Sequence, residues 1–203
     1  AVGIVSGNAM PDVNLQHLMA VALIDGTVSF EMSHSRERMA DPFAAPERIT
    51  VAEAFARHAD IDLLAMLPSA GPDCCRRFAE QANAAGVRTA NDDTWADIFS
   101  RVLAEKIEPH LGLGWPTILD EYPTEMSALA RPKADDPRVA ERFEIYVCGV
   151  ELANGFGELN DADEQRRRLM AQMAEKDRIY RDRYPIDEDF IQAVGAMPPA
   201  CGV

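Results

Sequence analysis

The stretch DPRVAERFEIYVCGVELANGFGELND, which runs from Asp136 to Asp161, decides the fold. Its segment from Arg142 to Val147 alternates polar and large apolar residues, which is the period of a half-buried strand. Cys148 and Gly149 supply a turn, and Val150 to Leu159 return as a second strand. Glycines in the return strand leave room for a ligand or another backbone to approach. The sequence therefore predicts a β-hairpin with a ligand-binding surface.

The predicted hairpin carries polar side chains that suit an amine, a metal-bound phosphate, or both. These side chains belong to Arg142, Glu144, Glu151, Asn154 and Glu158. Strict alternation places Glu151 and Glu158, which are seven positions apart, on opposite faces of a strand. A bulge at Gly155 or Gly157 would return both side chains to one face. A single shared pocket for the two carboxylates therefore requires such a bulge.

The amino-acid sequence of this stretch resembles that of the class II lysyl-tRNA synthetase family. The matching motifs are ERFE at 141–144 and GVELANGFGEL at 149–159. They are most similar to the branch of that family without an anticodon-binding domain, the elongation factor P lysine ligases. The resemblance covers about residues 42–203. Pro116–Pro123 before the hairpin and Glu164–Arg168 after it are among the segments that also match. It implies an α+β fold in which helices flank an antiparallel sheet, as in part of a class II catalytic domain.

The resemblance implies ATP-dependent activation of lysine or β-lysine and its transfer to elongation factor P, with ATP and Mg²⁺ as cofactors. Charge builds up at the α-phosphate during such a reaction, which therefore needs Mg²⁺ and cationic donors. Glu151 matches the carboxylate that holds the metal, and Leu152 matches a backbone contact to the nucleotide. Glu158 matches the carboxylate that grips the amine of lysine, with Asn154 beside it, because a buried ammonium must be paired. No residue is assigned a catalytic role.

The resemblance does not supply every part of such an enzyme. The first two motifs of the family, with an arginine and a glutamate for ATP, are expected before the matched region and are not found there. The glycine-rich strand with an ATP-binding arginine is expected after Val203. We therefore expect that this chain by itself does not form an acyl-adenylate.

The first part of the chain resembles a different family, MmgE/PrpD. The resemblance rests on Asn8–Leu18 and Leu23–Phe30. The sequence therefore divides into an MmgE/PrpD-like segment at 1–42 and a partial class II lysyl-tRNA synthetase-like domain at 43–203. Two alternatives to an active ligase remain: a non-catalytic fragment or fusion without ATP-binding motifs, and a remnant of an MmgE/PrpD hydro-lyase.

Charge limits the kind of partner. The formal net charge is −14, with 34 Asp and Glu against 20 Lys and Arg. Binding to a phosphate backbone needs clustered Lys and Arg, so tRNA is not an expected partner. The basic cluster Arg166–Arg168 lies among acidic residues and predicts a solvated helix face. Arg142 is expected to form an ion pair with Glu141 or Glu144.

The remaining composition predicts a cytoplasmic protein. No apolar run is long enough to span a bilayer, and no segment has the pattern of a signal peptide. The four cysteines have no metal-ligand spacing and are expected to be reduced thiols. No cluster of His, Cys, Asp and Glu predicts a metal site made by the protein alone. An unpaired strand edge of the hairpin favours association into a homo-oligomer.

Other elements follow from capping signals and apolar periodicity. A helix after Asp12 and a strand from Thr27 to Met32 are predicted near the start of the chain. Further helices are predicted at Thr50 to His58, opened by a capping box with Glu53; Ile61 to Met66, capped by Asp60; Pro72 to Ala85, stopped by Gly86; Trp95 to Ile107; and a long helix to Tyr180 capped by Asn160 or Asp161, with Leu169, Met170, Met173 and Ile179 pointing inward.

Overall fold

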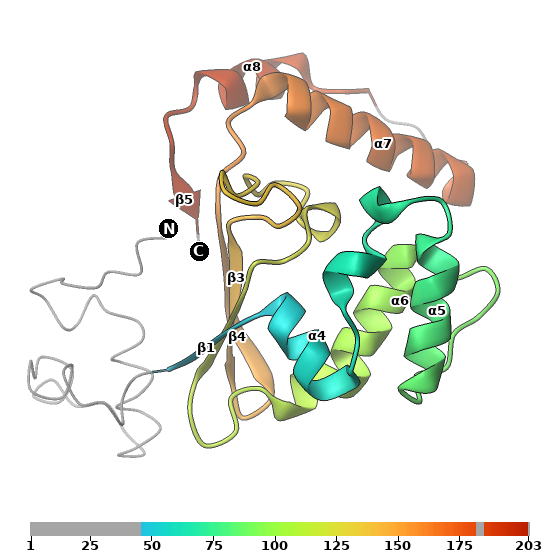
Figure 1. The fold of residues 1–203 in the computed structure, drawn as a ribbon. Helices are drawn as coiled ribbons and strands as arrows, with labels where there is room; N and C mark the ends of the chain where they lie inside the picture. Colours follow the sequence, from blue (N-terminus) through green and yellow to red (C-terminus); the bar gives the residue numbers. More distant parts are fainter. Residues whose placement is uncertain (1–45, 182–184, 203) are drawn as a thin grey trace, which may run out of the picture. The chain divides into compact units, whose positions relative to one another are not determined.

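A computed structural model describes residues 46–181 and 185–202 of the chain (Figure 1). The helix after Asp12, the strand from Thr27 to Met32 and the MmgE/PrpD-like segment lie outside these residues, so they stay predictions. The chain splits into two compact units. Among the described residues, the first unit holds 46–121 and Phe143–Asn154, and the second holds Tyr122–Arg142 and 155–202.

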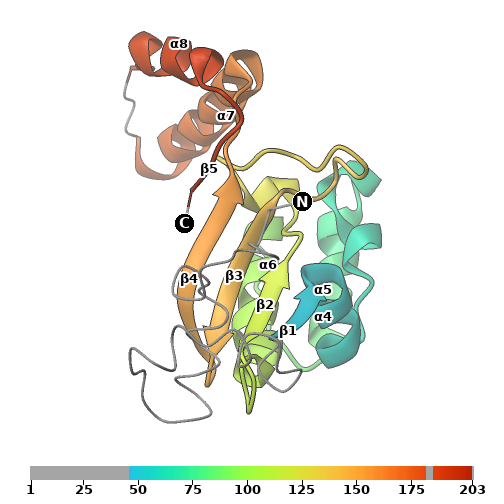
Figure 2. The same cartoon turned by 90° about the vertical axis from the view of Figure 1, so that its left-hand side faces the viewer.

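Within the described residues, five strands form a mixed sheet in the order β1-β2-β3-β4-β5 (Figure 2). Their bounds are Glu47–Thr50, Thr117–Asp120, Arg142–Val147, Val150–Gly157 and Cys201–Gly202. The strand β1 pairs with β2 in parallel, whereas β2 pairs with β3 and β4 pairs with β5 in antiparallel fashion. The predicted α+β class is confirmed, and β1, which was not predicted, adds a parallel edge to the expected antiparallel sheet.

The strands β3 and β4 are the predicted hairpin, and their turn has a specific backbone requirement. Cys148 and Gly149 both have positive φ angles, 52° and 74°. A two-residue hairpin turn with positive φ at both positions matches the twist of the flanking strands. The loop before β2 holds this turn, because the Cys148 N–H donates to the Gly112 carbonyl at 2.8 Å and the Gly149 N–H donates to the Leu111 carbonyl at 2.9 Å.

Gly112 is required where this loop meets β3. Its φ is 69°, and a Cβ atom placed on it would lie 2.6 Å from the Tyr146 carbonyl oxygen and the Val147 Cα. Its own N–H donates to the Thr117 hydroxyl at 2.9 Å. Only a residue without a side chain fits between the loop and the hairpin, so Gly112 fixes how close the two segments lie.

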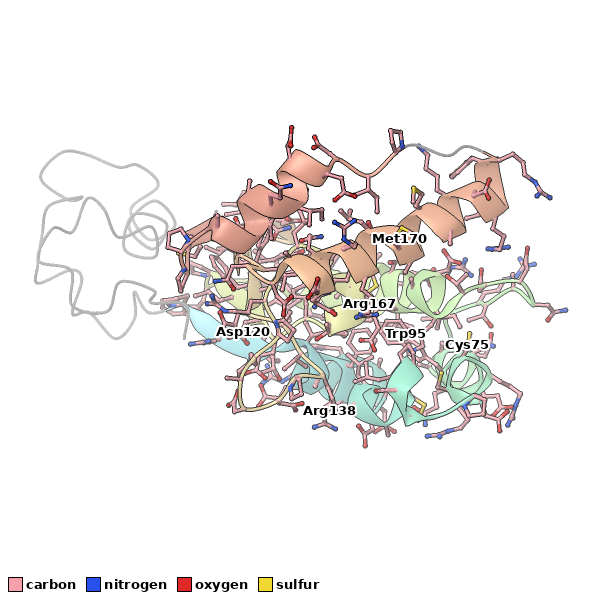
Figure 3. The ribbon with its side chains drawn as sticks, turned by 90° about the horizontal axis from the view of Figure 1, so that it is seen from above. Cys75, Trp95, Asp120, Arg138, Arg167 and Met170 are labelled. Atoms are coloured by element: carbon pink, nitrogen blue, oxygen red, sulfur yellow. The ribbon has the colours of Figure 1, made fainter. Side chains whose placement is uncertain are left out.

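The helices of the first unit lie on one face of its strands (Figures 1 and 2). The α-helices are α4 (Val51–Ala59), α5 (Cys74–Ala84) and α6 (Trp95–Val102), and shorter helical segments are Leu63–Met66, Pro68–Ala70, the π-helical Leu103–Ile107 and Glu108–His110. Their apolar faces bury aromatic rings at stacking distance: the Phe55 and Phe99 centroids are 5.2 Å apart, and those of Trp95 and Phe99 are 5.4 Å apart. Trp95 lies among these helices (Figure 3) and donates its indole N–H to the Met66 carbonyl at 2.6 Å.

Local capping signals gave mixed results in this unit. The Thr50 capping box is confirmed, since the Thr50 hydroxyl accepts from the Glu53 N–H at 3.1 Å and the Glu53 carboxylate accepts from the Thr50 N–H at 2.9 Å. The role predicted for Asp60 is wrong. Asp60 ends α4 in a left-handed conformation with φ 55°. Asp62 caps the following short helix instead, because its carboxylate accepts from the Ala65 N–H at 3.2 Å.

The described residues of the second unit form loops, two α-helices, the last part of β4 and the whole of β5. The helices are α7 (Ala162–Tyr180) and α8 (Glu188–Ala196), and Thr124–Met126 forms a short 3₁₀ turn. Asp161 caps α7, as one of the two predicted alternatives, by accepting from the Asp163 and Glu164 N–H groups at 3.0 Å each. No helix of the described residues is apolar over the length that crossing a bilayer requires.

The inward face predicted for α7 is partly wrong. Met170 and Ile179 are 50% and 52% exposed, whereas Gln165 and Arg168 are the buried residues of the described part of the helix. The helix therefore docks with polar groups, and its methionines do not form its main contact.

Replacing Gly112 with alanine should destabilise the first unit more than replacing Gly114. Both glycines have positive φ, 69° and 83°, so each alanine pays a backbone cost of about 1 kcal/mol. Only at Gly112 would the new Cβ meet backbone atoms, since Gly114 faces open space. Such overpacking typically adds about 1–3 kcal/mol. Urea unfolding of Gly112→Ala and Gly114→Ala measures the difference, and equal losses would contradict the role given to Gly112.

Candidate functional site

The four residues predicted to bind ligands fall in both units. Glu151, Leu152 and Asn154 lie on the β4 part of the first unit, and all three are exposed. Glu158 lies in the second unit, directly after the end of β4 at Gly157, and is half-buried. The structure therefore brings the first three together on one strand. The bulge required for a pocket shared with Glu158 stays a prediction.

Acidic side chains gather near Glu151 in the first unit. Glu144 on β3 is only 5% exposed, and its carboxylate accepts from the Tyr146 hydroxyl at 2.7 Å. Glu108, in the short helix Glu108–His110, is half-buried. Burial raises the pKa of the Glu108 carboxyl, and the negative charges of Glu144 and Glu151 raise it further. The negative charges of Glu144 and Glu151 therefore repel a negative charge on Glu108, and a nearby cation would reduce this repulsion.

This arrangement fits Mg²⁺ held jointly with a ligand better than a metal caged by protein. Within residues 46–181 and 185–202, no three or more His, Cys, Asp or Glu side chains are grouped closely enough to hold a metal ion. Mg²⁺ usually binds through one or two carboxylates together with substrate phosphates. Glu144 and Glu151 provide hard oxygen ligands of this kind, so the side chains present are compatible with a nucleotide-bound Mg²⁺.

The sequence analysis placed Glu144 on the predicted ligand-binding surface without a specific role, and it did not consider Glu108. Glu144 had a readable signal, because a carboxylate inside a strand of large apolar residues is rarely buried without a purpose. Glu108 had none, since it comes from a separate helical segment and approaches the hairpin only through the fold.

In the second unit, the backbone around Glu158 is held on two sides. The Glu158 N–H donates to the Ala200 carbonyl at 2.9 Å, and the Leu159 N–H donates to the Leu129 carbonyl at 2.9 Å. Glu158 also forms an isolated bridge with Ala130. Because extended segments from both sides fix its main chain, the Glu158 carboxylate can move only through its own side-chain torsions.

Arginines of the second unit make structural contacts beside this segment. Arg131 and Glu141 form an ion pair at 2.6 Å, with both side chains largely covered. Arg142, predicted to pair with Glu141 or Glu144, donates to the Met126 carbonyl and lies 4.4 Å from the centre of the Tyr122 ring. These contacts hold the loop Tyr122–Arg142 against itself.

The basic cluster on α7 is not uniformly solvated. Arg168 is only 7% exposed and donates to the Ser127 carbonyl at 2.8 Å and to the Ala130 carbonyl at 3.0 Å. Its Nε donates to the Glu164 carboxylate at 2.8 Å. The prediction of a solvated helix face is therefore correct for Arg167, whose side chain is 68% exposed, and wrong for Arg168.

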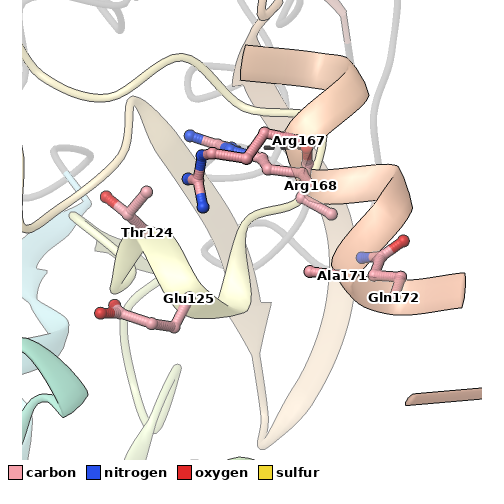
Figure 4. A pocket seen from close by; sticks show the side chains of 7 residues that line it. Thr124, Glu125, Arg167, Arg168, Ala171 and Gln172 are labelled. Atoms are coloured by element: carbon pink, nitrogen blue, oxygen red, sulfur yellow. Dashed lines mark hydrogen bonds between the residues drawn. The ribbon is translucent and has the colours of Figure 1, made fainter. Parts of the chain in front are cut away.

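Arg167 and Arg168 also line a cavity of about 340 Å³ within the second unit (Figure 4). The other lining residues are Thr124, Glu125, Ala128, Ala171 and Gln172. Hydrogen bonds from Arg167, and then from Arg168, hold the pKa of the nearby Glu164 carboxyl at about 2. Because both arginines are paired to Glu164 and Glu125 adds a further negative charge, the cavity carries no net charge that would select one ligand class.

Comparisons with known proteins add sequence relationships to this geometry. The family model described as tRNA synthetases class II (D, K and N) matches residues 15–203. The elongation factor P--(R)-beta-lysine ligase of Proteus mirabilis is 38% identical over 159 residues, which is 77% of this chain and 47% of the relative. The corresponding ligase of Edwardsiella ictaluri is 36% identical over 158 residues, again 77% of this chain and 47% of the relative. The lysine--tRNA ligase of Pelotomaculum thermopropionicum is 36% identical over 179 residues, 88% of this chain and 34% of the relative.

These matches bear on the sequence analysis in three ways. The resemblance read from the hairpin motifs is confirmed. The chain spans about half, or less, of the length of these relatives. The family match begins at residue 15, inside the segment 1–42 that was predicted to be MmgE/PrpD-like, and the domain boundary near residue 42 stays a prediction.

Replacing Arg168 should cost much more stability than replacing its neighbour. Arg168→Met removes donors from two buried carbonyl groups and from Glu164, and such buried charged contacts are worth about 2–4 kcal/mol together. Arg167→Met is the matched control, because an exposed ion pair contributes about 1 kcal/mol or less. Urea unfolding of both variants compares them, and equal destabilisation would argue against Arg168 as the anchor of α7.

Glu164 should make stability fall in acid. Its pKa of about 2 in the folded protein is below the unfolded value of about 4.3, so the unfolded chain binds more protons between these values. Its contribution is therefore fully present above about pH 4.3 and is lost as the pH falls toward about 2. The slope of unfolding free energy against pH in this window should be smaller for Glu164→Gln than for the wild type. An unchanged slope would show that Glu164 titrates alike in both states.

Proposed function

Because the chain belongs to the family of class II tRNA synthetases (D, K and N), we propose that it acts in ATP-dependent activation of lysine or (R)-β-lysine and its transfer to elongation factor P. Relatives bearing the name of the elongation factor P ligase are 34–38% identical over about three quarters of the chain, which supports this acceptor. A lysine--tRNA ligase is similarly related. The net charge of −14 favours a protein acceptor over tRNA.

The observation that carries this proposal is the acidic group on the hairpin. Glu151 is assigned to Mg²⁺ by the matching motif, and Glu144 on the neighbouring strand β3 of the hairpin would supply a second carboxylate. When bound, Mg²⁺ neutralises negative charge on the ATP phosphates and so assists attack at the α-phosphate. Leu152, beside Glu151 on the exposed start of β4, would meet the nucleotide through its backbone. The residues of this chain thus bind and orient the nucleotide.

The amine of the substrate is assigned to Glu158. A carboxylate pairs with an ammonium through charged hydrogen bonds, which are stronger than neutral ones. Glu158 is half-buried and its backbone is held on both sides, so little freedom is lost when it binds. Asn154 is assigned to the substrate by the same motif. These roles suit lysine and (R)-β-lysine alike, because both carry ammonium groups.

Calorimetry with lysine and (R)-β-lysine tests the assignment directly. Glu158→Gln should weaken binding of the preferred amino acid by about 10- to 100-fold, since a charged hydrogen bond is worth about 1.5–3 kcal/mol. Glu151→Gln should weaken binding of Mg²⁺ and ATP while leaving amino-acid binding unchanged. The exposed Glu105, in the π-helical segment Leu103–Ile107, provides the control Glu105→Gln, which should change neither.

If the wild type binds neither lysine nor (R)-β-lysine, the proposed function is overturned. Equal binding by Glu158→Gln and the wild type would remove Glu158 from the site. Exchange of labelled pyrophosphate into ATP, measured with and without each amino acid, then separates a chain that completes the activation step from one that only binds its substrates.

A further inference from the structure

A strand segment from far along the chain lies beside Glu158 in the second unit. The pairs Phe156–Gly202 and Gly157–Cys201 join β4 to β5 in antiparallel register (Figure 2). Continuing that register places Glu158 opposite Ala200, in agreement with the hydrogen bond from the Glu158 N–H to the Ala200 carbonyl. The β5 segment therefore forms one wall of the surroundings of Glu158.

Alternation determines which residue of β5 the Glu158 side chain meets. Residues two apart on a strand share a face, so Gly202 is on the same face as Ala200 and diagonal to Glu158. Long side chains reach diagonal neighbours in antiparallel pairs. The Glu158 side chain accordingly leans along the sheet toward Gly202.

No side chain fits at position 202 while the Glu158 carboxylate stays where it is. A Cβ atom built on Gly202 would lie 2.8 Å from Glu158 Oε1 and 3.9 Å from Glu158 Cδ. Among the described residues, and apart from the neighbours of Gly202 in the chain, no other heavy atom lies within 4 Å of that Cβ. Because the obstacle is the flexible end of a side chain and not backbone, alanine at 202 leaves the fold intact and displaces the carboxylate.

Gly157, the other glycine at this junction, has a different neighbour. A Cβ atom there would collide with the Glu141 carboxylate and lie 3.2 Å from Arg131 Nη2. A side chain at Gly157 would therefore break an ion pair of the loop, whereas a side chain at Gly202 meets, within the part of the chain that the structure describes, the Glu158 carboxylate.

We propose that Gly202 is a positioning residue: the absence of its side chain gives the Glu158 carboxylate its place, and through that carboxylate sets recognition of the substrate ammonium. The second half of this statement rests on the proposed function. Gly202 itself touches no substrate. Its effect on binding is transmitted entirely by where Glu158 Oε1 can lie.

A double-mutant cycle tests this with lysine as the probe. Gly202→Ala should weaken lysine binding by about tenfold in the presence of Glu158, within the range seen for residues in direct contact. In the Glu158→Gln background the same change should have little further effect, because the charged group it displaces is already gone. Cys201→Ala is the matched control, since Cys201 is exposed, belongs to the same short strand and lies on its opposite face. Thermal unfolding of each variant checks that the second unit stays folded.

A ligand-free measurement separates this inference from the proposed function. The carboxyl ¹³C signal of Glu158, identified by its loss in Glu158→Gln, should shift in Gly202→Ala and stay in place in Cys201→Ala. An unmoved signal in Gly202→Ala, or an equal loss of lysine binding in both backgrounds of the cycle, would overturn the positioning role. A shifted signal in a protein that binds neither lysine nor (R)-β-lysine would instead overturn the proposed function and leave the seating of the carboxylate established.

Discussion

The turn at Cys148 and Gly149 is the constraint on which the β3–β4 hairpin depends. A slip of one residue in a hairpin moves every side chain to the opposite face. Two consecutive positive φ angles, held by hydrogen bonds to Leu111 and Gly112, prevent such a slip. The register of β3 and β4 follows from the turn, and with it the placement of Glu151 near the carboxyl groups that act on Glu108.

Buried charge is handled in opposite ways in the two units. Arg168 donates through Nε and Nη1 to Glu164 and to backbone carbonyl groups, and these hydrogen bonds dock α7. Glu108, Glu144 and Glu151 have like charge, and burial together with the charges of Glu144 and Glu151 raises the pKa of the Glu108 carboxyl. Groups with perturbed pKa values cluster at functional sites, and this acidic group, not the arginine cluster, coincides with the motif that matches the family.

The sequence was informative where structure is local. The hairpin, the Thr50 capping box and the Asp161 cap depend on residues a few positions apart, and all three were predicted correctly. The strand β1, the burial of Arg168 and the approach of Glu108 to β3 depend on partners far away in the chain, and none was predicted. Within the candidate site, motif resemblance pointed to Glu151, Leu152, Asn154 and Glu158. It gave no view of the contacts around Glu158, because they come from separate loops.

The support of Glu158 by β5 also orders events in time. Gly202 and Ala200 follow Glu158 by about forty positions, whereas the two strands of the hairpin are separated by a two-residue turn. Local contacts form sooner than distant ones, because less chain entropy is lost in closing them. During synthesis the hairpin with Glu144 and Glu151 can therefore assemble well before the segment that seats Glu158 has left the ribosome. The surroundings of Glu144 and Glu151 can therefore form before those of Glu158.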